Sequence, residues 1–186
     1  MRAIATSYGL SKRGYYADFV TVPLATSVAM IWLFSLHTVN AAAFGLAVIT
    51  GAGAWTFAEY AIHRWSFHGN GPAATYASEH RMHHIHPAEF IGASPVTTAL
   101  VGAFGFWILT LLFGPALGVG LLVGLVLGYL FYIFVHDQMH HSTMPGKYFA
   151  KLNAAHELHH RRFKVNYGII TPFWDHVFGT YEKPEV

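Results

Sequence analysis

The sequence predicts an all-α integral membrane protein with four transmembrane helices, arranged as two hairpins beneath a histidine-rich cytoplasmic cap. Three observations support this: an apolar composition, four long apolar stretches, and a one-sided distribution of basic residues and histidines. Of the 186 residues, 54% are hydrophobic and only 11% are charged, and the mean hydropathy is +0.38. A water-soluble domain of this length carries more charge. We therefore expect one membrane-embedded domain, residues 1–186.

The four apolar stretches are each about 18 to 22 residues long, the length that crosses a hydrocarbon core as a helix. They cover residues 19–36, 41–62, 96–113 and 115–135. The connections at 37–40 and at Gly114 leave room only for tight turns, so the helices are expected to pair as two hairpins. In the fourth stretch, a glycine at every fourth position predicts a face for close helix packing: Gly120, Gly124 and Gly128.

The basic residues indicate the orientation of the chain in the membrane. All eleven lysines and arginines lie on one side of the four-helix plan: Arg2, Lys12, Arg13, Arg64, Arg81, Lys147, Lys151, Arg161, Arg162, Lys164 and Lys183. Because basic residues stay on the cytoplasmic side, both termini and the cap (residues 63–92 and 136–186) are expected to face the cytoplasm. The membrane would be a bacterial inner membrane, or the endoplasmic reticulum of a eukaryote.

Two classes of function are disfavoured by composition. The basic residues are too few and too close to the membrane to indicate nucleic-acid binding. The chain contains no cysteine, which excludes disulfides, thiolate-ligated haem and cysteine-ligated iron–sulfur clusters.

Thirteen of the fourteen histidines lie on the cap side, and most fall into the segments "EYAIHRWSFH", "SEHRMHHIHP", "FVHDQMHH" and "AAHELHH". Histidines three or four positions apart share one face of a helix. In the first segment, His63 and His68 are five apart and converge only if the helix end distorts or the stripe wraps around a site. We expect His37, His86 and His176 to be ordinary interfacial or core residues.

The clustered histidines predict a metal centre. Imidazole is the commonest metal ligand, and so many imidazoles exceed the need of one ion, which makes two ions the simplest interpretation. The predicted ligands are His63, His68, His80, His83, His84, His136, His140, His156, His159 and His160, with His141 as a further candidate.

The order HxxxxH, HxxHH, HxxxH, HxxHH on a membrane scaffold resembles the fatty acid hydroxylase/sterol desaturase superfamily. Within it, "EYAIHRWSFH" and the tail "VNYGIITPFWDHVFGTY" resemble the fatty acid 2-hydroxylases, and the likeness covers residues 55–181. The resemblance implies oxygen-dependent oxidation of a lipid C–H bond at a dinuclear metal centre. It also implies that one metal is held by His63, His68, His80, His84 and His159, and the other by His83, His136, His140, His156 and His160.

The sequence departs from that pattern in two places. It shows no fused cytochrome b5 domain and no HPGG haem motif, since Ala88 follows the His86–Pro87 pair; we therefore expect a separate electron carrier, cytochrome b5-like or ferredoxin-like. The third box also resembles the "VHD" box of carotenoid ring hydroxylases, in which His141 would replace His140. A carotenoid hydroxylase, a sterol or lipid desaturase, and a non-catalytic membrane metal carrier or sensor remain alternative functions.

The chemistry requires a redox metal, because zinc cannot activate dioxygen toward a C–H bond. Iron is the functional choice, although zinc binds such ligands more tightly and can occupy the site in a purified sample. Three carboxylates are candidates to accept hydrogen bonds from ligand N–H groups: Glu59, Asp137 and Asp175. Asp175 is equally well explained as the first turn of a short helix with Thr171 as its N-cap and Pro172 at its first position.

The substrate is predicted to enter from the membrane interface. An amphiphile with its headgroup in water would thread its acyl chain between the helices and present a carbon near the head, at C2 or a neighbour. Basic residues of the cap either hold an anionic headgroup or act only as topology signals. They are Lys147, Lys151, Arg161, Arg162 and Lys164.

Overall fold

The computed structural model describes residues 9–36, 39–69 and 74–184, and every regular element in these ranges is helical. In chain order the elements are α1 (Lys12–Tyr15), α2 (Asp18–Leu36), α3 (Ala41–Ala61), η1 (Ile62–Phe67), α4 (Ala74–Ile85), α5 (Pro95–His141), α6 (Lys147–Arg161) and α7 (Phe173–Val177). Among the described residues, three helical stretches are long and apolar enough to cross a membrane: Lys12–Leu36, Ala41–Phe67 and Pro95–His141. His37 lies outside the described residues.

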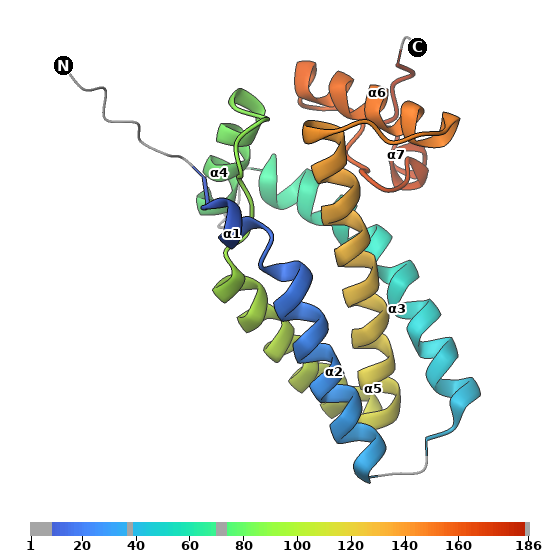
Figure 1. The fold of residues 1–186 in the computed structure, drawn as a ribbon. Coiled ribbons are helices and arrows are strands. Elements are labelled where there is room, and N and C mark those ends of the chain that lie inside the picture. Colours follow the sequence, from blue (N-terminus) through green and yellow to red (C-terminus); the bar gives the residue numbers. More distant parts are fainter. Residues whose placement is uncertain (1–8, 37–38, 70–73, 185–186) are drawn as a thin grey trace, which may run out of the picture.

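The long helix α5 reverses direction at Gly114 (Figure 1). The backbone there has φ 76° and ψ 167°, so the helix is broken into two segments. A positive φ is readily adopted by glycine and strongly disfavoured for a residue with a side chain, and Pro115 then starts the next segment with a suitable φ. The helices predicted at 96–113 and 115–135 correspond to the two segments of α5, and those at 19–36 and 41–62 correspond to α2 and α3.

Helix α3 packs closely against the second segment of α5 through small residues. A Cβ added at Gly124 would lie 2.1 Å from the carbonyl oxygen of Val48, and one at Gly120 would lie 2.8 Å from Cβ of Ala47. Gly128 faces the Trp55 side chain in the same way. The glycine face predicted in this segment is confirmed.

Helix α2 lies on the other side of α5 (Figure 1). It contacts the first α5 segment through the rings of Trp32 and Phe106, whose centroids are 5.5 Å apart. It meets α3 at their shared end, where the Phe34 and Phe44 ring centroids are 5.8 Å apart. The bundle is thus organised around α5, because α2 and α3 each contact α5 more extensively than they contact one another.

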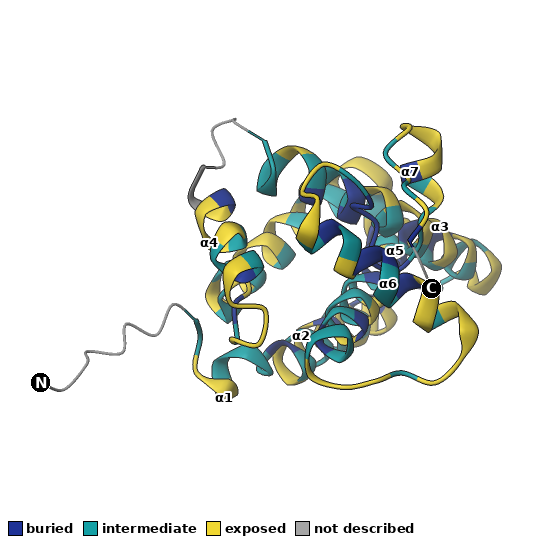
Figure 2. Ribbon diagram, turned by 90° about the horizontal axis from the view of Figure 1, so that it is seen from above, coloured by how far each residue is buried: buried dark blue, intermediate teal, exposed yellow. Residues whose placement is uncertain are grey.

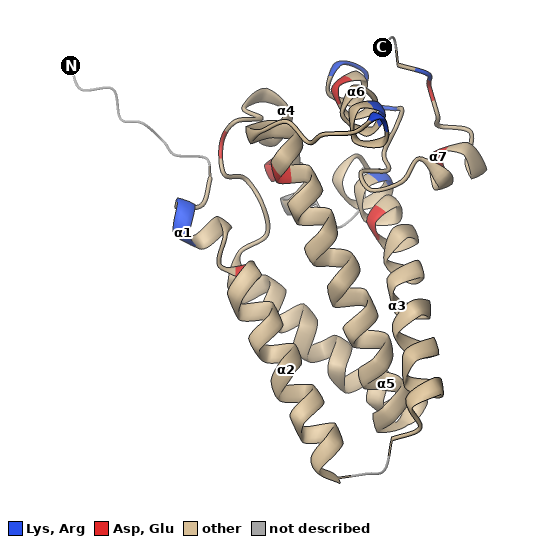
Figure 3. Ribbon diagram, turned by 45° about the vertical axis from the view of Figure 1, so that its right-hand side comes forward, with Lys and Arg blue, Asp and Glu red and all other residues tan. Residues whose placement is uncertain are grey.

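The surface of the bundle is apolar along its length, while charges gather at one end. Side chains such as Leu24, Ile49 and Leu100 are 62–72% exposed, and Figure 2 shows exposed residues running along the outer faces of the helices. The described Lys, Arg, Asp and Glu residues lie toward the end formed by α1, α4, α6 and α7 (Figure 3). Such a surface fits an integral membrane protein.

The cap is joined to the bundle by the chain that follows α6. Ile169 and Ile170 pack with Val135 of α5 in one buried apolar cluster. The short helix α7 begins at Phe173 with Pro172 as its N-cap, one residue later than predicted. Thr171 still contributes, because its Oγ1 accepts the Phe173 N–H at 3.2 Å.

Candidate metal centre

A π-helix brings His63 and His68 to the same side. Element η1 follows α3 without a break, and the His68 N–H bonds to the carbonyl oxygen of His63 at 3.2 Å. A π-helix has i→i+5 hydrogen bonds, so residues five apart lie on one face, which an α-helix does not allow. The sequence allowed this pair to converge through a distorted helix end or through a stripe that wraps around a site, and the structure shows a distorted helix end.

Five histidines form the first group: His63, His68, His80, His84 and His159. One ring nitrogen from each lies within 4.8 Å of all the others. The Nε2 atoms of His63 and His80 are 3.0 Å apart, as are those of His68 and His159. His84 Nε2 lies 3.0 Å from that of His80 and 3.3 Å from that of His68.

Four histidines form the second group: His83, His136, His140 and His156, again with one ring nitrogen each within 4.8 Å of the others. The Nε2 atom of His140 lies 2.9 Å from that of His156 and 3.2 Å from that of His136. Both ring nitrogens of His83 are buried without a hydrogen-bond partner.

His160 lies beside both groups and is part of neither. Its Nε2 is 3.1 Å from that of His156, and its ring centroid is 4.3 Å from that of His84 and 5.0 Å from that of His83. The structure thus brings all ten predicted histidines into one region. Their division matches the two sets implied by the family resemblance, except that His160 is outside the second group.

The donor atoms of the first group suit a cation. The Nδ1 of His63 donates to the carbonyl oxygen of Tyr167 at 2.6 Å, and the Nδ1 of His159 donates to that of Val165 at 2.7 Å. A neutral imidazole has one N–H, so the Nε2 atoms of His63 and His159 present lone pairs to the neighbouring rings and are free to bind a cation. Ring nitrogens 3.0–3.3 Å apart are close enough to bind one ion at metal–nitrogen distances of about 2.1 Å. Each group could therefore hold a metal ion.

Burial keeps the cap histidines in the form that binds metal. It lowers the pKa of His68 and His160 to about 4, that of His159 to about 3 and that of His84 to about 2, and neighbouring histidines lower the His68 and His84 values further. Removal from water disfavours the charged imidazolium. These side chains are therefore neutral near pH 7 and do not need to lose a proton before binding a metal.

The other histidines lie elsewhere. His141 faces away from both groups, with its Nε2 3.8 Å from Asp137 Oδ1 and its ring 5.3 Å from that of Phe90. Of the adjacent pair in the third box, the structure thus places His140 and not His141 in the second group. His86 and His176 are exposed, and the His176 ring stacks on Tyr181 at 4.0 Å.

The three candidate carboxylates have other partners than the histidine N–H groups, which corrects the prediction made for them. Asp137 accepts from the Tyr16 hydroxyl at 2.9 Å. Glu59 accepts the N–H groups of Ile169 and Ile170, and Asp175 accepts those of Tyr167 and Gly168; both carboxylates are at least 96% buried. The physical reason is that backbone carbonyls of the 165–170 loop already occupy the Nδ1–H groups of His63 and His159.

Sequence reasoning missed this loop, which is held in place by Asn166. Asn166 adopts φ 53°, a left-handed conformation that asparagine tolerates better than most residues. Its side chain donates to the carbonyl oxygen of Glu182 and accepts the Glu182 N–H, both at 2.9 Å. The Asn-Tyr-Gly sequence at residues 166–168, a few positions after the fourth box, is a turn signal that could have drawn attention to it.

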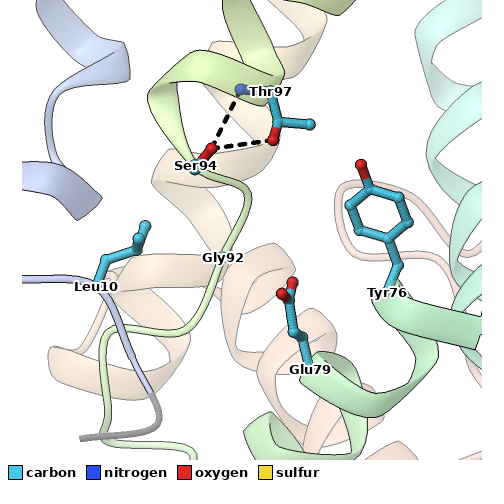
Figure 4. Close-up of a pocket in the computed structure, with 6 residues that line it drawn as sticks. All are labelled: Leu10, Tyr76, Glu79, Gly92, Ser94 and Thr97. Atoms are coloured by element: carbon cyan, nitrogen blue, oxygen red, sulfur yellow. Dashed lines mark hydrogen bonds between the residues drawn. The ribbon is translucent and has the colours of Figure 1, made fainter.

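The structure has a pocket beside the histidines and a second one nearer the start of α5. One, of about 460 Å³, lies beside the second group and is lined by Pro87, Ala88, Met139, His140, Asn153, His156, Glu157, His160 and Arg161. The other, of about 330 Å³, lies between α4 and the start of α5, where Tyr76 and Glu79 face Ser94 and Thr97 (Figure 4). The first pocket therefore offers access from the cap side to three of the predicted ligands.

The sequence is similar to those of proteins named as fatty acid and fatty acyl hydroxylases. The family model described as fatty acid hydroxylase matches residues 47–180. A dihydroceramide fatty acyl 2-hydroxylase of Arabidopsis thaliana is 31% identical over 179 residues, covering 88% of this chain and 76% of the relative. The fatty acid 2-hydroxylase of Homo sapiens is 34% identical, covering 71% of this chain and 39% of the relative.

Two further matches concern a yeast relative and the fold. The ceramide very long chain fatty acid hydroxylase of Schizosaccharomyces pombe is 34% identical, covering 71% of this chain and 41% of the relative, so the chain spans well under half of the yeast and human relatives. The solved structure of full-length scs7p, with only the hydroxylase domain visible, has the same fold, with a TM-score of 0.78 and 24% identity over 93% of this chain and 68% of that one. On the matched residues and the plant relative, the chain belongs to the fatty acid hydroxylase family.

Proposed function

We propose that this protein hydroxylates a lipid C–H bond, most favourably on a fatty acyl chain, at a site where two metal ions are bound by histidines. The observation that carries the proposal is the pair of histidine groups, in each of which one ring nitrogen per residue lies within 4.8 Å of all the others. Family membership supports the same activity, since the relatives that the chain resembles are named as fatty acid and fatty acyl hydroxylases.

The two groups would hold one ion each, with His160 completing the second group by a small movement. Iron, when bound with dioxygen and supplied with electrons, provides the oxidising power that an unactivated C–H bond requires. The Nε2 lone pairs of His63 and His159 would be available to an ion, and burial of the site limits the access of water. A separate electron carrier, cytochrome b5-like or ferredoxin-like, is proposed as the partner.

The acyl chain is proposed to lie between the helices with its headgroup at the cap, which favours oxidation at C2 or a neighbour. The pocket beside the second group supports this placement, because Arg161 and the rings of His140, His156 and His160 line it together. A headgroup near Arg161 would hold the first carbons of the chain close to the histidines. A product hydroxylated at mid-chain would contradict this arrangement.

The proposed membrane arrangement has four spans in two hairpins, at 19–36, 41–62, 96–113 and 115–135, in a single domain, residues 1–186. Both termini and the cap would face the cytoplasm, in a bacterial inner membrane or the endoplasmic reticulum. The gathering of charged residues at the cap end (Figure 3) and the exposed apolar side chains of the helices support it.

The test is to express the protein with iron and a source of reductant and to compare host lipids by mass spectrometry. Acyl chains that gain one oxygen atom support the proposal. A gain on carotenoids indicates the ring hydroxylase, and a loss of two hydrogen atoms indicates a desaturase. Bound metal with no lipid change indicates a carrier or sensor and contradicts the proposal.

Adjacent histidines supply a matched pair of variants. His140→Ala removes a member of the second group and should abolish product formation and the binding of one metal ion. The His141 ring packs on Phe90, so His141→Ala should retain metal content. Metal per chain is measured by elemental mass spectrometry. The reverse result would place His141 in the site and overturn the assignment of His140.

A further inference from the structure

The peptide group between Tyr167 and Gly168 is contacted on both of its edges. Its N–H donates to Asp175 Oδ2 at 2.8 Å, and its carbonyl oxygen accepts the Nδ1–H of His63 at 2.6 Å. Because a peptide group is planar and trans, its N–H and C=O point in opposite directions. The three groups therefore form one line: carboxylate, peptide, imidazole.

We propose that Asp175 is a positioning residue that sets the orientation and tautomer of His63 through this peptide. The inference rests on the proposed function, because it takes His63 as a metal ligand. Histidine ligands commonly donate their second N–H to a carboxylate or a backbone carbonyl. Here the two act in series. The Tyr167 carbonyl oxygen accepts the His63 N–H, and Asp175 accepts the N–H on the opposite edge of the same peptide.

The rest of the loop reinforces this arrangement. The four consecutive backbone N–H groups from Tyr167 to Ile170 all donate to buried carboxylates, the first two to Asp175 and the next two to Glu59. These four hydrogen bonds fix the directions of the N–H groups along the loop. With the N–H edge held in this way, the carbonyl of Tyr167 has one direction open to it, which is toward His63.

Gly168 makes the close approach of the carboxylate possible. A Cβ at this position would lie 2.9 Å from Asp175 Oδ2 and 2.1 Å from the carbonyl oxygen of Thr171. Any side chain would therefore displace Asp175 Oδ2 or the backbone carbonyl. The Tyr167–Gly168 peptide thus needs glycine so that the Asp175 carboxylate can approach, and it needs Asp175 to fix the direction of its N–H.

The two carboxylates differ in a way that yields a matched pair of variants. Asp175 uses both oxygens, because Oδ1 accepts the Tyr167 N–H at 2.8 Å and the Thr180 hydroxyl at 2.7 Å, while Oδ2 accepts the Gly168 N–H. Glu59 uses only Oε1, and its Oε2 has no partner. Asp175→Asn must therefore turn an NH₂ group toward a donor, whereas Glu59→Gln can keep both of its hydrogen bonds.

The experiment titrates Zn²⁺ into metal-stripped full-length protein in detergent, in competition with a chelator, and measures zinc per chain. For Asp175→Asn we expect affinity at one of two sites to fall about 10- to 100-fold, while the other site is unchanged. Glu59→Gln should retain both affinities. Cobalt(II) spectra of the same variants should show a change at one ion only, which a general loss of stability would not produce.

Two outcomes separate the inference from the proposed function. Two unchanged zinc sites in Asp175→Asn would overturn the inference and leave the proposed function standing. A wild-type chain that binds no metal would overturn both.

If Asp175→Asn does not fold, the inference is tested instead by measuring hydrogen exchange of the 165–170 amides in the wild-type protein. These amides should stay protected after metal removal, because carboxylates hold them. Loss of protection on stripping would show that the metal orders the loop, which would overturn the inference.

Discussion

A single methyl group at Gly124 should force α3 and α5 apart. Its added Cβ would lie 2.1 Å from the carbonyl oxygen of Val48, 2.6 Å from the backbone nitrogen of Ala52 and 2.8 Å from Cα of Gly51. All three obstacles are backbone atoms, so no side chain can rotate away to make space. The substitution therefore tests whether the two helices are held at the close distance that the glycines permit.

The expected change in unfolding free energy for Gly124→Ala follows from two opposing effects. Nonbonded carbon atoms pack best at about 3.5–4.0 Å, so the helices must separate by more than an ångström along this face. Overpacking of this kind costs about 1–3 kcal/mol, and rigid obstacles put Gly124→Ala at the upper end. Alanine recovers up to about 1 kcal/mol through its higher helix propensity. The net loss of unfolding free energy is then about 2 kcal/mol.

The assay is thermal unfolding of the purified, metal-bound protein in detergent. At about 2–4 °C per kcal/mol for a chain of this size, the midpoint for Gly124→Ala should fall by about 4–8 °C. The control is Gly53→Ala in α3, where an added Cβ meets no atom within 4 Å, and its midpoint should stay or rise. A midpoint for Gly124→Ala at or above that of the wild type would refute the close helix contact.

Three further outcomes are expected. Tyr16→Phe removes the hydroxyl that bonds Asp137 at 2.9 Å, and the loss of this donor to a buried carboxylate should lower the unfolding free energy by about 1–3 kcal/mol, measured by denaturant titration. Gly168→Ala brings a Cβ within 2.1 Å of the Thr171 carbonyl oxygen and should lower both the thermal midpoint and metal content, so a variant with normal metal content would contradict the tight loop. A strong chelator should lower the midpoint of the wild type, since metal at 1,000 times its Kd stabilises the folded state by about 4 kcal/mol; an unmoved midpoint would argue against bound metal.

The helices could be predicted from sequence because membrane spans are coded by hydropathy and turns by glycine and proline. The Gly114–Pro115 pair marked the reversal inside α5, and the glycine stripe marked the face that meets α3. Hydropathy does not say which helices are neighbours. The central place of α5, between α2 and α3, therefore required the three-dimensional structure.

The site was predictable where the spacing of histidines along a helix sets the direction of their side chains, and unpredictable where the fold of a loop decides the contacts. Histidines three and four apart gathered as expected, and the five-residue spacing of His63 and His68 is explained by the π-helix. Glu59 and Asp175 were placed near the histidines but with the wrong partners. The fold of the 165–170 loop decides those contacts. Asn-Tyr-Gly signals a turn there, but the local sequence does not say which distant groups the turn contacts.

The reversal at Gly114 also bears on how the chain enters a bilayer. Its neighbours are Phe113 and Pro115, with only apolar residues for several positions on either side, and proline has no N–H to leave unsatisfied. No charged group has to be carried across lipid, so both segments of α5 can insert together as one preformed unit. The third histidine box lies at the end of that unit, so a hairpin inserted in this way would leave the box on the side of the membrane from which it entered.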